Sequence, residues 1–233
     1  MGTMVLMSGV FQWLFSQYEG VPTEQVWAEA IAVVFGLLSV WFAKKGNIWV
    51  YPTGLINTIT FVWLLWVNTL WGDMLINAYY TVMSIYGWVL WSRNAHHNVV
   101  EVSWATRTEW RIASVLGVAS AVFVAVVYYL KPFIKNGFSM EGVQLGAHNF
   151  RWTECVDILT TALFLVGMWL MAKRKVENWV LWIIADLISV PLYYVKGMKF
   201  TSLQYALFTA IAVMGYISWK KSVVSSQGSE HNG

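Results

Sequence analysis

Charged side chains are scarce in this chain. Only 12% of its 233 residues are Asp, Glu, Lys or Arg, whereas an ordinary soluble domain carries about 25%. Hydrophobic residues make up 58% of the chain, and tryptophan occurs 16 times. A chain with so few charges and so much apolar surface is predicted to be an integral membrane protein.

Several kinds of chemistry lack the residues that they require. All four histidines lie outside the long apolar runs, so neither an imidazole metal site nor a histidine proton relay is predicted in the membrane. There is no GxSxG nucleophile motif, no Walker A motif, and no lysine in the last apolar run that could hold retinal. Cys155 is the single cysteine and cannot form a disulfide within the chain. We therefore expect no enzyme activity, no metal and no cofactor.

Seven apolar runs follow one another along the chain, at residues 27–43, 48–68, 74–91, 110–130, 155–172, 179–195 and 200–219. Each can cross a hydrocarbon core of roughly 30 Å as a helix that rises about 1.5 Å per residue. Strand alternation is absent, and a helix satisfies every backbone amide within its own segment. The sequence therefore predicts an all-α membrane protein with seven transmembrane helices.

The two ends of the chain differ from the spans. Residues 4–15 are apolar but too short to cross a membrane, and we predict a short helix that lies on the membrane surface. After Lys221 the chain is polar and rich in Gly and Ser, which predicts a disordered tail.

Basic residues are distributed unevenly between the two sides that seven spans define. Ten of the 15 Lys and Arg residues fall on the side that holds the C-terminus, and five fall on the other. Because basic loops stay in the cytoplasm, the C-terminus is predicted to be cytoplasmic. The net charge of +3 then reflects topology and needs no nucleic-acid partner.

The first three spans resemble the last three. One constant shift along the chain, which we call the repeat shift, superposes Gly87 on Gly215 and Trp91 on Trp219. Because one span separates the two units, both enter the membrane in the same direction, as in the parallel repeats of SWEET-type transporters, which favours alternating access around a site between the halves. The predicted parts are a surface helix with its lead-in (1–26), the first three-helix repeat (27–91), a linker with the fourth helix and an outer loop (92–152), the second repeat (153–219) and a polar tail (220–233).

One carboxylate interrupts the sixth apolar run. Asp186 lies about 10 Å of helix beyond Trp179, near the bilayer midplane, where an ionisable group is costly unless it faces a cavity or a partner. Its helical face is shared by Asn178, Trp182, Ser189 and Tyr193. We predict that this stripe faces the inside of the bundle.

Further polar residues come from other spans. Asn57 falls on Asp186 when the chain is moved one position beyond the repeat shift, which predicts that the two are pseudo-symmetric partners. Asn77 and Tyr80 lie in the third span, and Gln204 lies in the last. Together these side chains outline a pocket for a flat ring that bears a polyol, since indole rings stack on such heterocycles, more strongly on cationic ones, and amides bind hydroxyls.

Structural roles stay open for the same residues. Tryptophans at span ends commonly anchor a protein at the membrane interface. Asn and Gln within spans can hydrogen-bond to neighbouring helices, and Asp186 can be neutral and structural.

The motif Glu177-Asn178-Trp179-x-x-Trp182-x-x-x-Asp186, together with the span endings Gly87-Trp88-x-x-Trp91 and Gly215-Tyr216-x-x-Trp219, resembles the PnuC family of bacterial vitamin transporters. The resemblance extends over nearly the whole chain, from the first span to the seventh. It implies an inner-membrane carrier for nicotinamide riboside that works by facilitated diffusion, with a separate cytoplasmic kinase that traps the substrate. It also implies a homo-oligomer, with a trimer as one arrangement.

By this resemblance, Trp182 stacks on the pyridinium ring, and Asn178 and Asp186 make polar contacts. The remaining predicted site residues rest on the stripe argument, and they are Asn57, Asn77, Tyr80, Gln204, Ser189 and Tyr193.

Two other functions stay open. A carrier of another flat-ring vitamin, such as thiamine or riboflavin, would share the fold, and it would be proton-coupled if Asp186 titrates. A membrane receptor would bind the ligand without translocating it. The duplicated unit favours a carrier, because a carrier rocks about its site.

Overall fold

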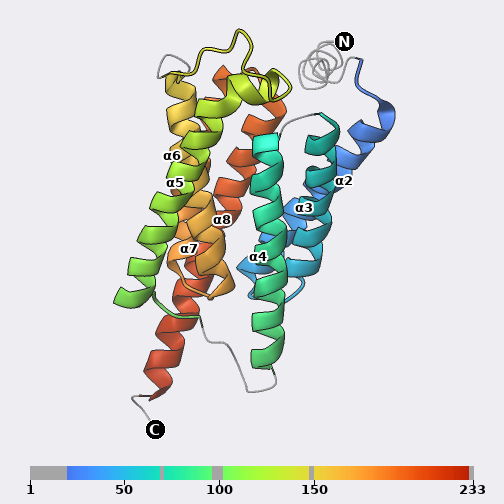
Figure 1. The fold of residues 1–233 in the computed structure, drawn as a ribbon. Coiled ribbons are helices and arrows are strands. Elements are labelled where there is room, and N and C mark those ends of the chain that lie inside the picture. The colour runs from blue at the N-terminus through green and yellow to red at the C-terminus, as the bar shows by residue number, and fades with distance from the viewer. Residues whose placement is uncertain (1–19, 69–70, 96–101, 147–149, 231–233) are drawn as a thin grey trace, which may run out of the picture.

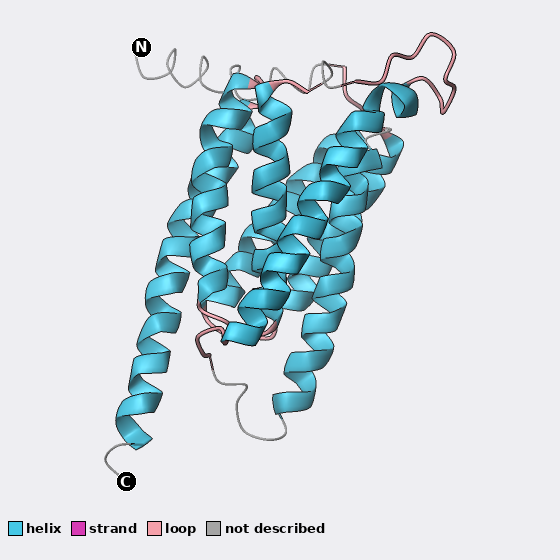
Figure 2. Cartoon of the chain, turned by 60° about the vertical axis from the view of Figure 1, so that its left-hand side comes forward, coloured by secondary structure: helices cyan, strands magenta, loops and turns pink. Residues whose placement is uncertain are grey.

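The computed structural model describes residues 20–68, 71–95, 102–146 and 150–230. Its helices are α2 (Thr23–Lys44), α3 (Val50–Val67), α4 (Trp71–Ala95), α5 (Arg107–Lys135), α6 (Trp152–Ala172), α7 (Glu177–Val195) and α8 (Lys199–Glu230). They run side by side as one bundle, and the described part of the chain contains no strand (Figures 1 and 2). The prediction of an all-α protein is confirmed. The surface helix expected at residues 4–15 lies outside the described residues.

Five of these helices, α2, α3, α5, α6 and α7, are long and apolar enough to cross a membrane. The chain is therefore a multi-pass membrane protein. α4 and α8 have the length but carry more polar side chains, Asn77 and Gln204 among them.

Helix α8 continues past Trp219 as far as Glu230, and Figure 1 shows it extending beyond the rest of the bundle. The prediction of a disordered tail after Lys221 is therefore wrong up to this residue. Val223 is 4% exposed and packs into the core, and the Ser225 hydroxyl donates to the carbonyl of Lys221 one turn earlier. A buried apolar side chain thus extends the helix into a polar segment.

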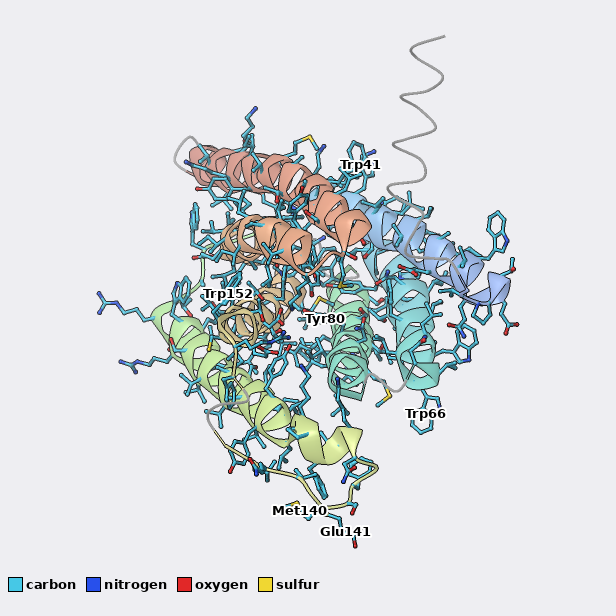
Figure 3. All side chains as sticks on the ribbon, turned by 90° about the horizontal axis from the view of Figure 1, so that it is seen from above. Trp41, Trp66, Tyr80, Met140, Glu141 and Trp152 are labelled. Carbon is cyan, nitrogen blue, oxygen red and sulfur yellow. The ribbon has the colours of Figure 1, made fainter. Side chains whose placement is uncertain are left out.

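Contacts between helices follow a closed order. α2 packs on α3 and α3 on α4, α6 packs on α7 and α7 on α8, and the circle closes where α8 meets α2 and α4 meets α6. α5 lies outside this ring, against α6. Seen along the bundle in Figure 3, Tyr80 of α4 lies near the centre of the ring.

The largest buried side chains gather where α3, α4, α7 and α8 meet. We call Tyr51, Trp91, Trp179 and Trp219 the aromatic core, since all four are almost fully buried. Tyr51 meets Trp91 edge-on with ring centres 5.0 Å apart, and Trp179 meets Trp219 edge-on at 5.4 Å. Trp91 and Trp219 approach each other at 6.5 Å and so connect the two pairs.

Trp91 of α4 and Trp219 of α8 also donate hydrogen bonds to the ends of other helices. The Trp91 Nε1–H donates to the Ala172 carbonyl at the end of α6 (3.1 Å), and the Trp219 Nε1–H donates to the Ala43 carbonyl at the end of α2 (3.0 Å). Carbonyls in the last turn of a helix accept no hydrogen bond from an amide of the same helix. Trp91 therefore caps the C-terminal end of α6, and Trp219 caps that of α2.

These contacts bear on the predicted internal repeat. Tyr51 and Trp179, which the repeat shift superposes, occupy equivalent places, because each ring lies against a glycine of the next helix, Gly87 or Gly215. In this register Thr58, which is buried, takes the position of Asp186. The predicted partner of Asp186 is Asn57, the residue before Thr58, and this pairing stays a prediction.

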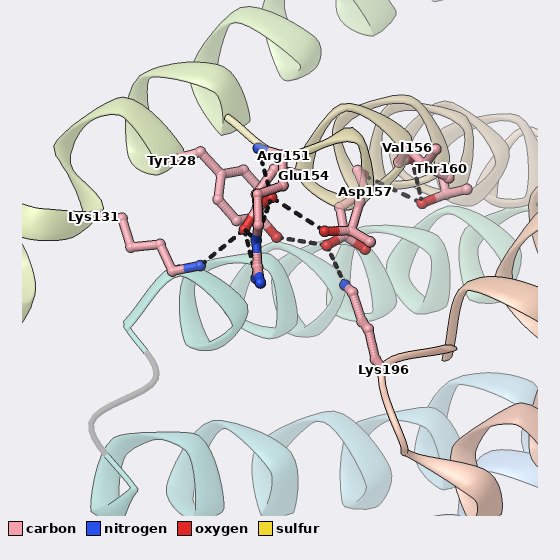
Figure 4. Close-up of polar contacts among 9 residues, drawn as sticks. Tyr128, Lys131, Arg151, Glu154, Val156, Asp157, Thr160 and Lys196 are labelled. Atoms are coloured by element: carbon pink, nitrogen blue, oxygen red, sulfur yellow. Dashed lines mark hydrogen bonds and ion pairs between the residues drawn. The ribbon is translucent and has the colours of Figure 1, made fainter. Parts of the chain in front are cut away.

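A hydrogen bond and ion pairs tie helix α5 to α6 and to the turn that follows α6. Near the end of α5, Tyr128 donates to Asp157 of α6 at 2.8 Å, and Lys131 pairs with Glu154 at 3.3 Å (Figure 4). Lys196, just after α7, also pairs with Asp157. The start of α5 is held as well, since Glu109 pairs at 3.0 Å with Lys175, which lies in the turn between α6 and α7.

The fit of Tyr51 against Gly87 gives a test of the aromatic core. A methyl group at Gly87 would lie 2.3 Å from the Tyr51 ring, so Gly87→Ala should lower the midpoint of thermal unfolding in detergent. The overlap costs about 1–3 kcal/mol, more than the roughly 1 kcal/mol that alanine gains over glycine in a helix. Gly117→Ala in α5 is the control, because its methyl group would meet Val166 at 3.4 Å. Equal midpoints for the two variants would contradict the tight fit.

Candidate functional site

The polar stripe of α7 is buried. Asn178 is 0% exposed, Asp186 is 3% exposed and Ser189 is 1% exposed. They recur at helical spacing and therefore lie on one face, which packs between α6 and α8. A helix that buries this stripe must place it against polar partners or against a ligand.

Two atoms of this stripe have no hydrogen-bond partner in the described part of the chain. They are Asn178 Oδ1 and Ser189 Oγ. The Asn178 Nδ2 group is satisfied, since it donates to the Lys175 carbonyl at 2.6 Å. A buried acceptor and a buried hydroxyl without partners are the groups that a bound ligand or water would satisfy.

Asp186 lies among tyrosines rather than cations. The described residues form no ion pair with it. Tyr80 of α4 and Tyr205 of α8 lie close enough to its carboxyl group to interact with it electrostatically. Tyr193 stacks on Tyr205 with ring centres 5.0 Å apart and 16° between the planes. The carboxyl group thus faces an aromatic surface built by three helices.

Tyr205 is a residue that the sequence reasoning missed. The predicted site includes its neighbour Gln204 instead, which is half-buried. The Tyr205 ring lies 5.8 Å from that of Phe164 of α6, centre to centre, and also contacts the Tyr193 ring. One sequence signal was available, since Tyr205 lies one helical turn before Phe208 and falls on Asn77 at the repeat shift.

Trp182 is held from two sides. Its ring meets Trp179 edge-on at 5.5 Å, and its Nε1 edge lies against Gly167 of α6, where a methyl group would come within 2.3 Å. The indole is half-buried, so part of its surface stays free for a ligand. Glycine at position 167 lets α6 and this indole approach closely.

Residues predicted from the first half divide between two roles. Asn57 donates to the Ala32 carbonyl of α2 at 2.7 Å and lies against Gly36, so its amide nitrogen joins α3 to α2. Asn77 and Tyr80 are half-buried on α4, and Tyr80 approaches the Asp186 group.

The stripe is too long for one small ligand to contact throughout. Asn178 and Ser189 are separated by about 16 Å along α7, and Tyr193 lies a further turn away. The predicted residues thus form two levels. Asn178 and Trp182 lie near the aromatic core. Asp186, Ser189 and Tyr193 lie farther along α7, toward its C-terminal end, and Tyr80 lies near Asp186.

A multi-pass helical bundle with a buried polar stripe has the architecture of a membrane transport protein. A family model described as nicotinamide mononucleotide transporter matches residues 26–221, and the chain belongs to this family.

Named relatives agree with this assignment. The chain is 30% identical over 210 residues to the nicotinamide riboside transporter PnuC of Escherichia coli strain K12, which covers 84% of this chain and 86% of that protein. It is 22% identical over 197 residues to the riboflavin/roseoflavin transporter RibM of Streptomyces davaonensis, covering 83% and 84%. These relatives are transporters and not enzymes.

A solved structure has the same fold. The crystal structure of the vitamin B3 transporter PnuC matches with a TM-score of 0.63 and 24% sequence identity, over 92% of this chain and 90% of that one.

The unpaired hydroxyl of Ser189 gives a test of the site without any ligand. Ser189→Ala should leave the thermal unfolding midpoint unchanged or raise it, because it removes a buried group that has no partner. Ser202→Ala is the matched control, since Ser202 is also buried and donates to the Val190 carbonyl at 2.8 Å. Its loss should cost about 1 kcal/mol. A larger loss for Ser189→Ala than for Ser202→Ala would show that Ser189 is bound within the protein.

Proposed function

We propose that this protein is a facilitative carrier that imports nicotinamide riboside across the bacterial inner membrane. The observation that carries the proposal is Asp186, a buried carboxyl group that has aromatic neighbours and no ion pair among the described residues. A pyridinium ring brings the missing positive charge, and its ribose brings hydroxyls for unpaired acceptors. The relative from Escherichia coli is named for transport of this compound.

In this proposal Trp182 stacks on the pyridinium ring, with a gain of about 0.5–2 kcal/mol when the contact is desolvated. Asp186 balances the charge, and Ser189 and Asn178 bind hydroxyls or waters at their two levels. Tyr80 and Tyr193 form the aromatic wall. The further contacts proposed from the stripe argument are those of Asn57, through its carbonyl oxygen, Asn77 and Gln204.

The bundle works as two parallel three-helix repeats joined by a linker helix. Helices α2–α4 form the first repeat (27–91), α6–α8 form the second (153–219), and α5 is the linker (92–152). The closed order of helix contacts and the crossed tryptophan bonds support this division, because each contact in one repeat has a counterpart in the other. α4 and α8 span the membrane with their polar faces turned inward. The C-terminus is cytoplasmic, because ten of 15 basic residues then face the cytoplasm.

Transport follows alternating access around the site, down the gradient of the substrate. No nucleotide motif supplies energy, so net import depends on a separate cytoplasmic kinase that phosphorylates the riboside and traps it. The working unit is a homo-oligomer, with a trimer as one arrangement.

A second candidate is a carrier for another flat-ring vitamin, coupled to protons if Asp186 titrates. The observation that favours it is the relative from Streptomyces davaonensis, which is named as a riboflavin/roseoflavin transporter. Thiamine has a flat cationic ring as well. The third candidate is a receptor that binds the vitamin without transporting it. The paired repeats favour a carrier over a receptor, because a carrier rocks about its site.

The substrate is tested by calorimetric titration of the purified protein in detergent. The ligands are nicotinamide riboside, thiamine, riboflavin and nicotinamide. We expect heat of binding from nicotinamide riboside and none from nicotinamide, which lacks both the ribose and the fixed charge. Binding of thiamine or riboflavin in its place would assign the chain to the second candidate.

Variants at Trp182 and Asp186 test the assigned contacts in the same titration. Trp182→Ala should weaken binding of nicotinamide riboside by about 3- to 30-fold, the equivalent of one desolvated cation–π contact. Asp186→Asn keeps the size but removes the charge and should weaken binding by about 100-fold or more if the charge is needed. Trp63→Ala and Glu24→Gln are the controls, since both side chains are exposed. Unchanged affinity in both site variants would show that the ligand binds at another place.

A further inference from the structure

The described polar contacts between the two repeats concentrate at one end of the bundle. They join Trp91 to Ala172, Trp219 to Ala43, Arg174 to Gly46 and Tyr51 to Met171. Farther along, Tyr79 of α4 donates to the Leu165 carbonyl of α6 at 3.1 Å. One end of the bundle is thus closed by contacts that cross from one repeat to the other.

The opposite end differs in its hydrogen bonds and ion pairs, because those shown for the described residues there join helices of one repeat or reach the linker. Asn68, just after α3, donates to Gln25 of α2 at 3.2 Å. Lys196, which is the counterpart of Asn68 at the repeat shift, pairs with Asp157 of α6. Such ties keep the helices of one repeat together, and they do not hold the two repeats to each other.

The crossed indole bonds are well suited to hold a closed state. Both indoles are buried, and each bonds to the partially negative C-terminal end of a helix. Arg174 strengthens the same place, since its guanidinium lies 3.9 Å from the centre of the Trp91 ring and donates to the Gly46 carbonyl at 2.8 Å. The repeat shift sets Arg174 on Gly46, so only the second repeat supplies this cation.

We infer that the crossed bonds of Trp91 and Trp219, with Arg174 as a one-sided latch, form the cytoplasmic gate of the carrier. This inference rests on the proposed function, because it uses the proposed orientation and alternating access. The gate is closed in the described conformation. Each transport cycle breaks both indole bonds, moves the ends of α2 and α6 away from α8 and α4, and closes the gate again.

A cysteine behind the gate reports its opening. Ala43 is 1% exposed, so Ala43→Cys should react slowly with a membrane-impermeant maleimide added to inside-out vesicles. The background variant is Cys155→Ser, because the native Cys155 is exposed. In this background Trp91→Phe and Trp219→Phe each keep an aromatic ring and remove one N–H donor. The Ala43 carbonyl retains its bond from the Gly46 amide at 2.9 Å, so Trp219→Phe leaves it with a partner.

We expect the labelling rate to rise about fivefold for each single variant and about thirtyfold for the double variant, since each bond contributes about 1 kcal/mol. Arg174→Gln should raise the rate as well. Trp63→Phe is the control, because Trp63 is 45% exposed, and it should leave the rate unchanged. If the double variant does not fold, the two single variants and Arg174→Gln decide the outcome.

Two results would overturn the gate. One is a labelling rate that does not respond to either tryptophan, and the other is an equal rise in Trp63→Phe. Calorimetry on the same proteins separates this inference from the proposed function. Faster labelling in the tryptophan variants of a protein that binds none of the four vitamins would support the gate and refute the substrate, whereas normal binding with unchanged labelling would refute the gate alone.

Discussion

A bilayer core offers no water to a polar atom, and the structure follows from this constraint. Backbone amides are satisfied within helices, and carbonyls at two helix ends are capped by indoles of the opposite repeat. Where a polar atom has no partner among the described residues, as at Asn178 Oδ1 and Ser189 Oγ, a bound ligand or water would satisfy it. The stabilising contacts and the candidate site are therefore two outcomes of the same requirement.

Glycine and large aromatic rings make this arrangement possible. Tyr51 and Trp179 fill the space beside Gly87 and Gly215, and each then supports a tryptophan that crosses to the other repeat. The aromatic core therefore adds to the contacts of α2 with α8 and of α4 with α6. A carrier needs such a junction, because its halves must be held firmly and still separate during transport.

Much of the fold was predictable from local pattern, because apolar length and the helical period are properties of neighbouring residues. The buried stripe around Asp186 belongs to this class. The partner of Asp186 is harder to predict, since a slip of one residue in the repeat shift exchanges Thr58 for Asn57 and only the packing of Tyr51 and Trp179 against Gly87 and Gly215 bears on that shift. Tyr205 and the helical extension at Val223 depend on tertiary contacts that no local pattern records.

Uptake of labelled nicotinamide riboside into liposomes that contain the purified protein decides whether the protein is a facilitative carrier. Equal potassium on both sides with valinomycin removes any membrane potential, which would otherwise act on a cationic substrate. If the protein is a facilitative carrier, we expect uptake that ends when the inner and outer concentrations are equal, with or without a pH gradient. Accumulation above that level driven by the pH gradient, or no uptake by a protein that binds the compound, would contradict a facilitative carrier.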